Sequence, residues 1–229
     1  MIASVHLADV GFPASLAVLR KAPKPKDVPG LRHAEVAVAA PLGGSALPAP
    51  QVGRVGLIAF WEDDAALDRF LDGHRLAQRL GGGWRIRLEP LRAFGAFPGL
   101  PADVARPRTV TEDGPAAVLT LGRFKWHRAV PFFRTSRKAE LAVVDAPGLA
   151  WAMGMARPPF VATCSLWESG HAAAGYAYGP SDAPHQAAID TDRAKPFHRQ
   201  EAFIRFRPYD SVGRLEGKNP LPERWLSTA

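Results

Sequence analysis

The sequence predicts an α+β fold in which one βαββαβ unit occurs twice, and two internal likenesses support this prediction. Residues 28–31, Val-Pro-Gly-Leu, return as Ala-Pro-Gly-Leu at residues 146–149. An apolar run that ends in Trp-Glu at residues 58–62 returns at residues 164–168, and a stretch of small residues follows each run. Likenesses that recur in the same order indicate an internal repeat, which has to be recognised before single elements are assigned.

The first half of the chain gives the βαββαβ order directly. Pro13 suits the first position of a helix, and residues 53–61 are apolar on both faces, as expected of a strand that is covered on both sides. Leu67, Phe70 and His74 follow the spacing of one helix face. We expect strands at 2–9, 33–40, 53–61 and 84–95, and helices at 13–21 and 63–80.

The second half repeats this order with different spacing. Residues 41–52, rich in Pro, Gly and Ala, predict a long loop that belongs to the first half only. His185 follows the second Trp-Glu pair as His74 follows the first, with a longer approach. We expect strands near 116–124, 149–156, 159–167 and 200–208, a helix near 127–137 and a helical region from 170 to 195.

These elements divide the chain into a first ferredoxin-like repeat at 1–97, a proline-rich linker at 98–115 and a second repeat with a C-terminal tail at 116–229. In a ferredoxin-like unit, helices cover one face of an antiparallel sheet and leave the other face bare. Two bare faces bury each other when they meet. We therefore expect tandem ferredoxin-like repeats that form a pseudo-dimeric α+β barrel.

Composition limits the class of protein. The 229 residues are 47% hydrophobic and 22% charged, which is ordinary for a globular protein. A continuous apolar run of about 18 residues is absent, so we expect no membrane-spanning helix, and the N-terminus does not have the pattern of a signal peptide. The single cysteine, Cys164, fits a reducing compartment. We expect a cytoplasmic protein.

The net charge of +7 favours anionic partners, such as nucleic acid, a membrane surface or an acidic ligand. An RNA-recognition module is also βαββαβ, but it needs a pattern of aromatic residues on its third strand. Residues 53–60 and 160–166 lack that pattern, so we expect no nucleic-acid partner. A peripheral, salt-sensitive contact with the inner face of an anionic membrane is expected instead.

Several segments of the second half form a recognisable series. Residues 160–168 read Phe-Val-Ala-Thr-Cys-Ser-Leu-Trp-Glu, and residues 179–189 read Gly-Pro-Ser-Asp-Ala-Pro-His-Gln-Ala-Ala-Ile. Residues 201–207 read Glu-Ala-Phe-Ile-Arg-Phe-Arg, and Glu-Gly at 216–217 and Asn-Pro-Leu at 219–221 close the series. In order and spacing, these segments resemble the spheroidene monooxygenases, a family of bacterial carotenoid oxygenases. The likeness covers residues 116–221 well and the first half loosely.

The resemblance implies a b-type haem, oxygen insertion into a hydrophobic carotenoid- or isoprenoid-like substrate, and electrons from an external donor such as a ferredoxin. The glycine runs at 43–44 and 81–83 do not follow the strand–turn–helix pattern of a dinucleotide loop, so the chain offers no flavin or nicotinamide site of its own. Two alternatives stay open: a haem enzyme of another reaction type, such as a dehydratase or peroxidase, and a non-catalytic haem or lipid carrier. The distal catalytic residues are unknown, and a homo-oligomer is left open.

Given the resemblance, His185 is the expected axial ligand of the haem iron. Asp182 suits an N-cap and Pro184 suits a helix start, which places His185 in the first turn of a predicted helix. The positive end of the helix dipole favours the neutral imidazole that iron requires. On spacing alone, a packed core histidine is an equal interpretation, and His74 is expected to be structural.

Four further residues are candidates for cofactor binding. Arg205 and Arg207 share one face of the last predicted strand, and Arg193 and Tyr178 flank His185. A planar guanidinium pairs well with a haem propionate. A solvated strand face is the alternative interpretation for the two strand arginines.

The strand at 149–156 departs from the family pattern. It lacks the basic residue expected there and carries Trp151, Met153 and Met155 at alternate positions, so these three side chains point to one side. They form either an adaptable wall of a hydrophobic substrate pocket or ordinary core packing. Elsewhere, Cys164 is expected to be a small buried residue, and His198 a surface residue.

Overall fold

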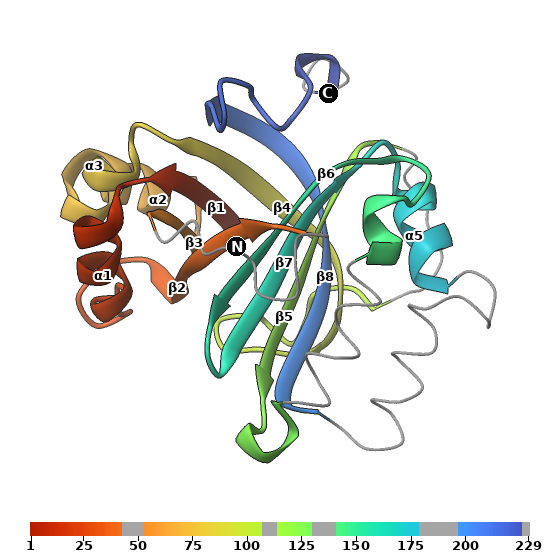
Figure 1. Ribbon diagram of the computed structural model, residues 1–229, viewed down its shortest axis with the longest axis horizontal. Coiled ribbons are helices and arrows are strands. Elements are labelled where there is room, and N and C mark those ends of the chain that lie inside the picture. The colour runs from red at the N-terminus through yellow and green to blue at the C-terminus, as the bar shows by residue number, and fades with distance from the viewer. Residues whose placement is uncertain (43–52, 107–113, 130–140, 179–196, 226–229) are drawn as a thin grey trace.

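The computed structural model describes residues 1–42, 53–106, 114–129, 141–178 and 197–225. Elements are numbered as in Figure 1. The strands are β1 (Ile2–Asp9), β2 (Leu31–Pro41), β3 (Arg54–Trp61), β4 (Trp84–Ala96), β5 (Ala116–Phe124), β6 (Leu149–Arg157), β7 (Phe160–Trp167) and β8 (His198–Gly213). The helices are α1 (Phe12–Arg20), α2 (Asp64–Gly73), α3 (Arg75–Leu80) and α5 (Gly170–Tyr178), with short 3-10 helices η1 (Trp126–Arg128) and η2 (Glu223–Trp225).

The strands close into one antiparallel barrel in the order β1-β3-β2-β6-β7-β5-β8-β4 (Figure 1). Within this circle, the first half contributes β4-β1-β3-β2 and the second half contributes β8-β5-β7-β6, so the two halves have the same strand order. The halves join where β2 pairs with β6 and where β4 pairs with β8. The α+β barrel predicted from the sequence is therefore confirmed.

Each sheet has an inner face and an outer face. Buried side chains from strands of both halves fill the barrel interior, as expected when two bare sheet faces meet. On the outer face of the first half, α1, α2 and α3 cover a second apolar core. On the outer face of the second half, α5 lies over β5 and β7. Figure 1 shows α1, α2 and α3 at one end of the molecule and α5 at the other.

The repeated Pro-Gly-Leu segments have the same geometry in both halves. Gly30 and Gly148 both have a φ of +78°, a conformation that favours glycine. A Cβ on Gly30 would lie 2.4 Å from the Cβ of Ala66, and a Cβ on Gly148 would lie 2.6 Å from that of Ala172. The glycine therefore lets the chain pass close to the helix that follows each Trp-Glu pair. Whether each half is a complete βαββαβ unit stays a prediction, as do the limits of the two repeats, because residues 130–140 and 179–196 lie outside the described residues.

The predicted helix at 63–80 is two helices that meet at His74, so a single helix is wrong. Gly73 ends α2, and the Nδ1 of His74 accepts a hydrogen bond from the backbone N–H of Leu76 at 3.1 Å, which caps α3. The His74 ring stacks on Phe70 with 4.7 Å between ring centroids, and burial lowers its pKa. The break follows from the poor helix propensity of glycine.

The last strand, predicted at 200–208, continues to Gly213. Pro208 lies at a register shift between β4 and β8, as Pro90 does further along the same pair of strands. A proline that cannot donate a ladder hydrogen bond is tolerated at such irregularities. The predicted helices at 127–137 and 170–195 are only partly described: residues 126–128 form η1, and residues 170–178 form α5. Each helix within the described ranges is too short or too polar to serve as a bilayer span.

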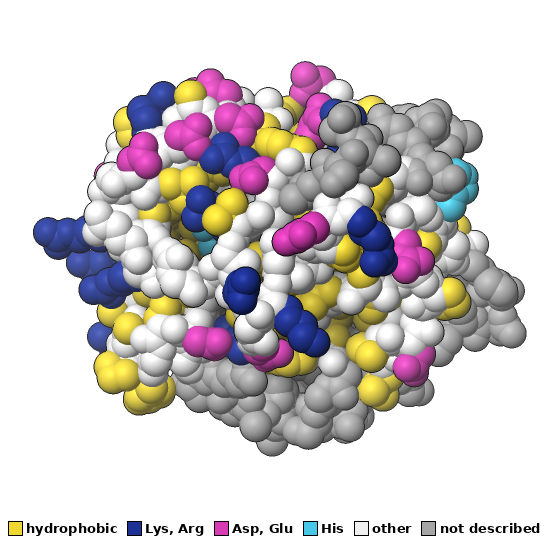
Figure 2. Space-filling model, turned by 90° about the horizontal axis from the view of Figure 1, so that it is seen from above, with side chains coloured by type: hydrophobic (Ala, Val, Ile, Leu, Met, Phe, Trp, Pro, Cys, Tyr) yellow, Lys and Arg dark blue, Asp and Glu magenta, His cyan; other side chains and the backbone are white. Residues whose placement is uncertain are grey.

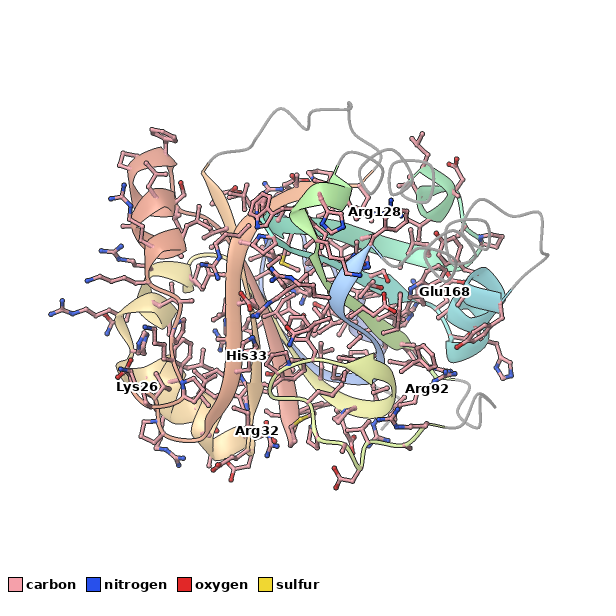
Figure 3. The ribbon with its side chains drawn as sticks, turned by 90° about the horizontal axis from the view of Figure 1, so that it is seen from below. Lys26, Arg32, His33, Arg92, Arg128 and Glu168 are labelled. Atoms are coloured by element: carbon pink, nitrogen blue, oxygen red, sulfur yellow. The ribbon has the colours of Figure 1, made fainter. Side chains whose placement is uncertain are left out.

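A buried carboxylate ties the two halves together at one end of the barrel. Glu35 of β2 accepts hydrogen bonds from Arg157 of β6, at 2.9 Å, and from Arg123 of β5. His33 also belongs to β2 (Figure 3), and its Nε2 lies 3.0 Å from the same carboxylate. The side chain of Glu35 is 5% exposed, whereas those of Arg123 and Arg157 are 31% and 39% exposed. The cluster thus connects the first half to two strands of the second.

We expect Glu35→Gln to lower the free energy of unfolding by about 2 kcal/mol at neutral pH, because the arginines lose a buried charged acceptor. Burial by itself raises the pKa of Glu35, but hydrogen bonds from His33 and Arg123 outweigh it and lower the pKa from 4.5 to about 2. A lowered folded-state pKa adds stability above pH 4.5, and this contribution is lost as the pH falls towards 2. Urea unfolding from pH 7 to pH 3 measures both effects.

The control variant is Glu89→Gln, since Glu89 pairs with Arg207 at the exposed surface. The free energy of unfolding of this variant should fall by less than about 1 kcal/mol. Its stability should depend on pH between 7 and 3 as that of the wild type does. Equal losses in the two variants would show that Glu35 does not tie the halves together.

Candidate functional site

The outer faces of the two half-sheets can be compared position by position. In the first half, Ile2 of β1 pairs with Trp61 of β3, and in the second half Ala116 of β5 pairs with Trp167 of β7. Counting four residues from these pairs along β1 and β5 places the pair His6–Leu57 and the pair Thr120–Thr163 at equivalent positions. The register therefore shows which side chains occupy the same place on each face.

The first of these faces is filled. His6 is 2% exposed and Leu57 is 0% exposed, under the cover of α2 and α3. The packing is tight enough that burial, with help from Arg85 and Arg87, lowers the pKa of His6 to about 3. The neutral imidazole instead hydrogen-bonds to Ser4 at 3.0 Å. This face leaves no room for a ligand.

The second face is more open. Thr120 and Thr163 are smaller than the side chains at the equivalent positions, yet they are half-buried rather than buried. Val118 and Val161, on the same face of β5 and β7, are also half-buried. Ala116 and Trp167, at one end of this face, are buried in an apolar cluster with α5, whereas the two threonines and two valines further along the strands stay partly accessible. The outer face of the second half is the candidate site, and we call it the β5–β7 face.

Two arginines stand beside this face. Arg92 of β4 pairs with Arg205 of β8 in the strand register. Arg92 is 8% exposed, its Nη2 donates to the hydroxyl of Tyr178 at 2.8 Å, and its guanidinium carbon lies 5.7 Å from the centre of the Tyr178 ring. Arg205 is half-buried, with its Nη1 3.5 Å from the carbonyl of Gly170 at the start of α5. The backbone positions of the two arginines are paired, and their guanidinium groups reach opposite ends of α5, Arg92 at Tyr178 and Arg205 at Gly170. Each is a group that can bind a carboxylate or phosphate.

Figure 3 shows Arg92 and Glu168 on the side of the barrel that carries α5. Sequence reasoning missed Arg92, because it lies in the first half of the chain and is brought to the second only by the pairing of β4 with β8. The signal that could have found it is the proline two residues before it, since Pro90 marks a strand irregularity that decides which face Arg92 takes.

The structure places the predicted cofactor residues unevenly. His185 and Arg193 lie outside the described residues. Arg205 lies at the β5–β7 face, and Tyr178, although 52% exposed, reaches this region through Arg92. Arg207 is on the same side of β8 but is exposed and paired with Glu89. Arg205 and Tyr178 are thus the two predicted cofactor residues that lie next to Arg92, Arg205 through strand pairing and Tyr178 through its hydroxyl.

Another histidine approaches this face. His198 was expected at the surface, and that expectation is wrong, because its side chain is only 16% exposed. A Cβ on Gly122 of β5 would lie only 2.7 Å from the His198 ring, so a glycine at this position makes room for the ring. The Nδ1 of His198 lies 3.3 Å from Glu201. His198 is thus an imidazole that lies beside the β5–β7 face.

The predicted substrate wall lies on the opposite side of the sheet. Met153 and Met155 are 2% and 3% exposed inside the barrel, and Trp151 packs against the same interior cluster. The Trp151 ring meets that of Trp84 edge-on, with 5.1 Å between centroids. The three side chains do share one side, as predicted, and their contacts are those of core residues. Their role as a pocket wall stays a prediction.

Other chemistry is sparse in the described part of the chain. Cys164 is buried as predicted, and burial raises the pKa of its thiol to about 12, so it is a packed side chain rather than a reactive thiolate. Nowhere among the described residues do three or more His, Cys, Asp or Glu side chains come together in a way that could hold a metal ion. An open hollow of about 430 Å³ lies at the ends of β4 and β8, lined by residues 95–98 and 199–201.

Comparison with known proteins assigns the family. The chain is 32% identical over 196 residues to spheroidene monooxygenase of Rubrivivax gelatinosus, covering 83% of this chain and 73% of that relative. It is 25% identical over 183 residues to spheroidene monooxygenase of Cereibacter sphaeroides, covering 77% of this chain and 56% of that relative. This protein belongs to the spheroidene monooxygenase family, and it is an oxygenase. The resemblance stated from the sequence is confirmed.

Solved structures support the fold. An aldoxime dehydratase in complex with butyraldoxime superposes with a TM-score of 0.55 at 7% identity, over 96% of this chain and 84% of that one. A second aldoxime dehydratase structure gives a TM-score of 0.50 at 10% identity, over 96% of this chain and 86% of that one. At such low identity the likeness shows the fold alone. No protein-family model matches the chain.

Proposed function

We propose that this protein is a haem-dependent monooxygenase that inserts oxygen into a hydrophobic, carotenoid- or isoprenoid-like substrate, with electrons from an external donor such as a ferredoxin. The observation that carries the proposal is the contrast between the two outer faces. Two half-sheets with the same strand order differ in that one is filled by helices and the other is lined by small, half-buried side chains. In a chain of the spheroidene monooxygenase family, the β5–β7 face would accommodate a flat, largely apolar cofactor.

The residues of the β5–β7 face fit a b-type haem. A haem presents an apolar ring with two carboxylates at one edge, and the face combines Val118 and Val161 with two arginines at its margin. Arg92 and Arg205 would pair with the carboxylates, and Tyr178 would hold the Arg92 guanidinium in position through its hydroxyl. His185 would supply the axial imidazole. When bound, the haem supplies iron that activates molecular oxygen.

The proposed reaction also needs electrons, a place for the substrate and protection from water. A monooxygenase places one oxygen atom in the substrate and reduces the other to water, which consumes two electrons that an external donor has to deliver. A hydrophobic substrate would lie beside the haem on this outer side of the sheet rather than against Trp151, Met153 and Met155, because those side chains belong to the packed barrel interior. Exclusion of water from such a site favours the reaction of the substrate over side reactions.

The first test is the axial ligand. We expect purified protein with haemin to give a Soret band that shifts with carbon monoxide, and we expect His185→Ala to abolish haem retention while the far-ultraviolet circular dichroism is unchanged. The matched control is His198→Ala, which removes the imidazole that lies beside the β5–β7 face in the structure and should keep the haem. Retention in His185→Ala with loss in His198→Ala would move the ligand to His198. Retention in both variants would contradict ligation by either histidine, and a protein that stays colourless would contradict haem binding itself.

Activity is tested with the same preparations. With a reducing system and oxygen, the haem-loaded protein should convert an acyclic carotenoid to a product that is heavier by one oxygen atom, detected by mass spectrometry. A haem-loaded protein that leaves all hydrophobic substrates unchanged would contradict the oxygenase part of the proposal and favour a haem carrier.

The second test concerns the arginines. We expect Arg92→Leu to weaken haem binding about tenfold, the loss of about one charge-assisted hydrogen bond, when the Soret band is titrated. Binding of the haem dimethyl ester, which lacks the carboxylate charges, should change little. Arg207→Leu is the control, because Arg207 is exposed and pairs with Glu89, and it should bind haem as the wild type does. Equal weakening of haem and of its ester in Arg92→Leu would contradict a propionate contact.

A further inference from the structure

Helix α1 presents two large apolar side chains to solvent. Phe12 is 58% exposed and Leu16 is 40% exposed, and a spacing of four residues puts both on one side of the helix. The opposite side is anchored, since Ser15 and Val18 are buried at 0% and 3% exposure. The exposed pair is therefore a fixed feature of the docked helix.

Exposed basic side chains follow the apolar pair along the chain. Arg20 at the end of α1 is followed by Lys21, Lys24 and Lys26, and all four are exposed. Asp27 is the single acidic residue between residues 10 and 30, so this stretch carries four positive charges against one negative charge. Figure 2 shows Lys and Arg side chains standing out at the end of the molecule where Figure 1 places α1.

The basic segment is held in shape. Pro23 is buried between the exposed lysines, and the backbone N–H groups of Asp27 and Val28 donate to the carbonyl of Lys24 at 2.9 and 3.2 Å. The lysines are thus presented on an ordered turn beside the helix. Order before binding limits the entropy that is lost when a surface is engaged.

We propose that Phe12, Leu16, Arg20, Lys21, Lys24 and Lys26, here called the α1 surface, bind an anionic lipid bilayer. Apolar side chains inserted at the boundary of the acyl chains, with cations over the headgroups, are the combination that holds a helix in a membrane interface. Each lysine or arginine near an anionic surface adds to this attraction. The positive charge of the α1 surface favours an anionic lipid surface over a second copy of this chain, because two copies would bring like charges together.

The α1 surface lies near the barrel seam. The Nη1 of Arg157, which belongs to the Glu35 cluster between β2 and β6, lies 3.5 Å from the carbonyl of Leu19. Lipid binding would hold this end of the barrel at the bilayer, while the β5–β7 face lies with α5 at the other end of the molecule (Figure 1). Lipid binding by the α1 surface therefore does not depend on the proposed oxygenase function.

The test is flotation of the full chain with vesicles of phosphatidylglycerol and phosphatidylcholine, compared with vesicles of phosphatidylcholine alone. We expect binding to the anionic vesicles that weakens as salt increases. Lys21→Glu/Lys24→Glu should weaken it at least about tenfold, because each reversal removes one attractive charge and adds a repulsive one. Arg214→Glu/Lys218→Glu, in the segment after β8, changes the net charge equally at another exposed place and should bind nearly as the wild type.

The apolar part has its own pair of variants. Phe12→Ser should weaken vesicle binding, whereas Trp126→Ser, which removes an aromatic ring of similar exposure at 62%, should not. Equal loss in the α1 variants and their controls would overturn the proposal, since charge or hydrophobicity alone would then suffice. A wild-type dimer that Phe12→Ser converts to a monomer, without vesicle binding by either, would also overturn it and make a second copy the occupant. Haem content is measured in parallel, so that failure of the proposed function is seen separately.

Discussion

Closure of the barrel is the constraint on which the rest of this structure depends. Each half contributes four strands with two free edges, and an unpaired edge exposes backbone donors and acceptors. Pairing β2 with β6 and β4 with β8 removes all of these edges at once. The same pairing defines an interior, filled by side chains of both halves, and two outer faces that need separate cover. The buried Glu35 cluster and the Arg92–Arg205 pair both lie across these seams.

The two outer faces are covered differently. Three helices fill the face of the first half, with Leu57 and His6 packed beneath them, whereas a smaller apolar cluster that includes Ala116 and Trp167 lies under α5 on the other face. The β5–β7 face carries threonines where the first half has larger side chains. Arg205 comes from β8 of the same half and Arg92 from β4 of the other, so side chains beside this face are positioned by the seam between the halves.

Much of this arrangement could be predicted from the chain alone. The Pro-Gly-Leu segments recur at equivalent places of the two halves, because a glycine is needed where the chain passes close to the following helix at positions 30 and 148. Alternation placed Met153 and Met155 on one side of a strand but could not say whether that side was the barrel interior or the outer face. Arg92 was not predicted as a site residue, because Pro90 marks only a strand irregularity. Its pairing with Arg205, more than a hundred residues away, depends on the folded sheet. The break at His74 was missed because the helical spacing of apolar side chains continues past Gly73. The low helix propensity of this one glycine does not disturb that spacing.

The central claim is that the β5–β7 face, and not the barrel interior, holds the cofactor. Titration of haemin into the variant Thr120→Phe/Thr163→Leu tests it most directly, because these substitutions fill the outer face and leave every interior side chain unchanged. The account predicts a folded protein, by circular dichroism, whose affinity for haem falls about tenfold or more. A folded variant that takes up haem as tightly as the wild type would contradict it.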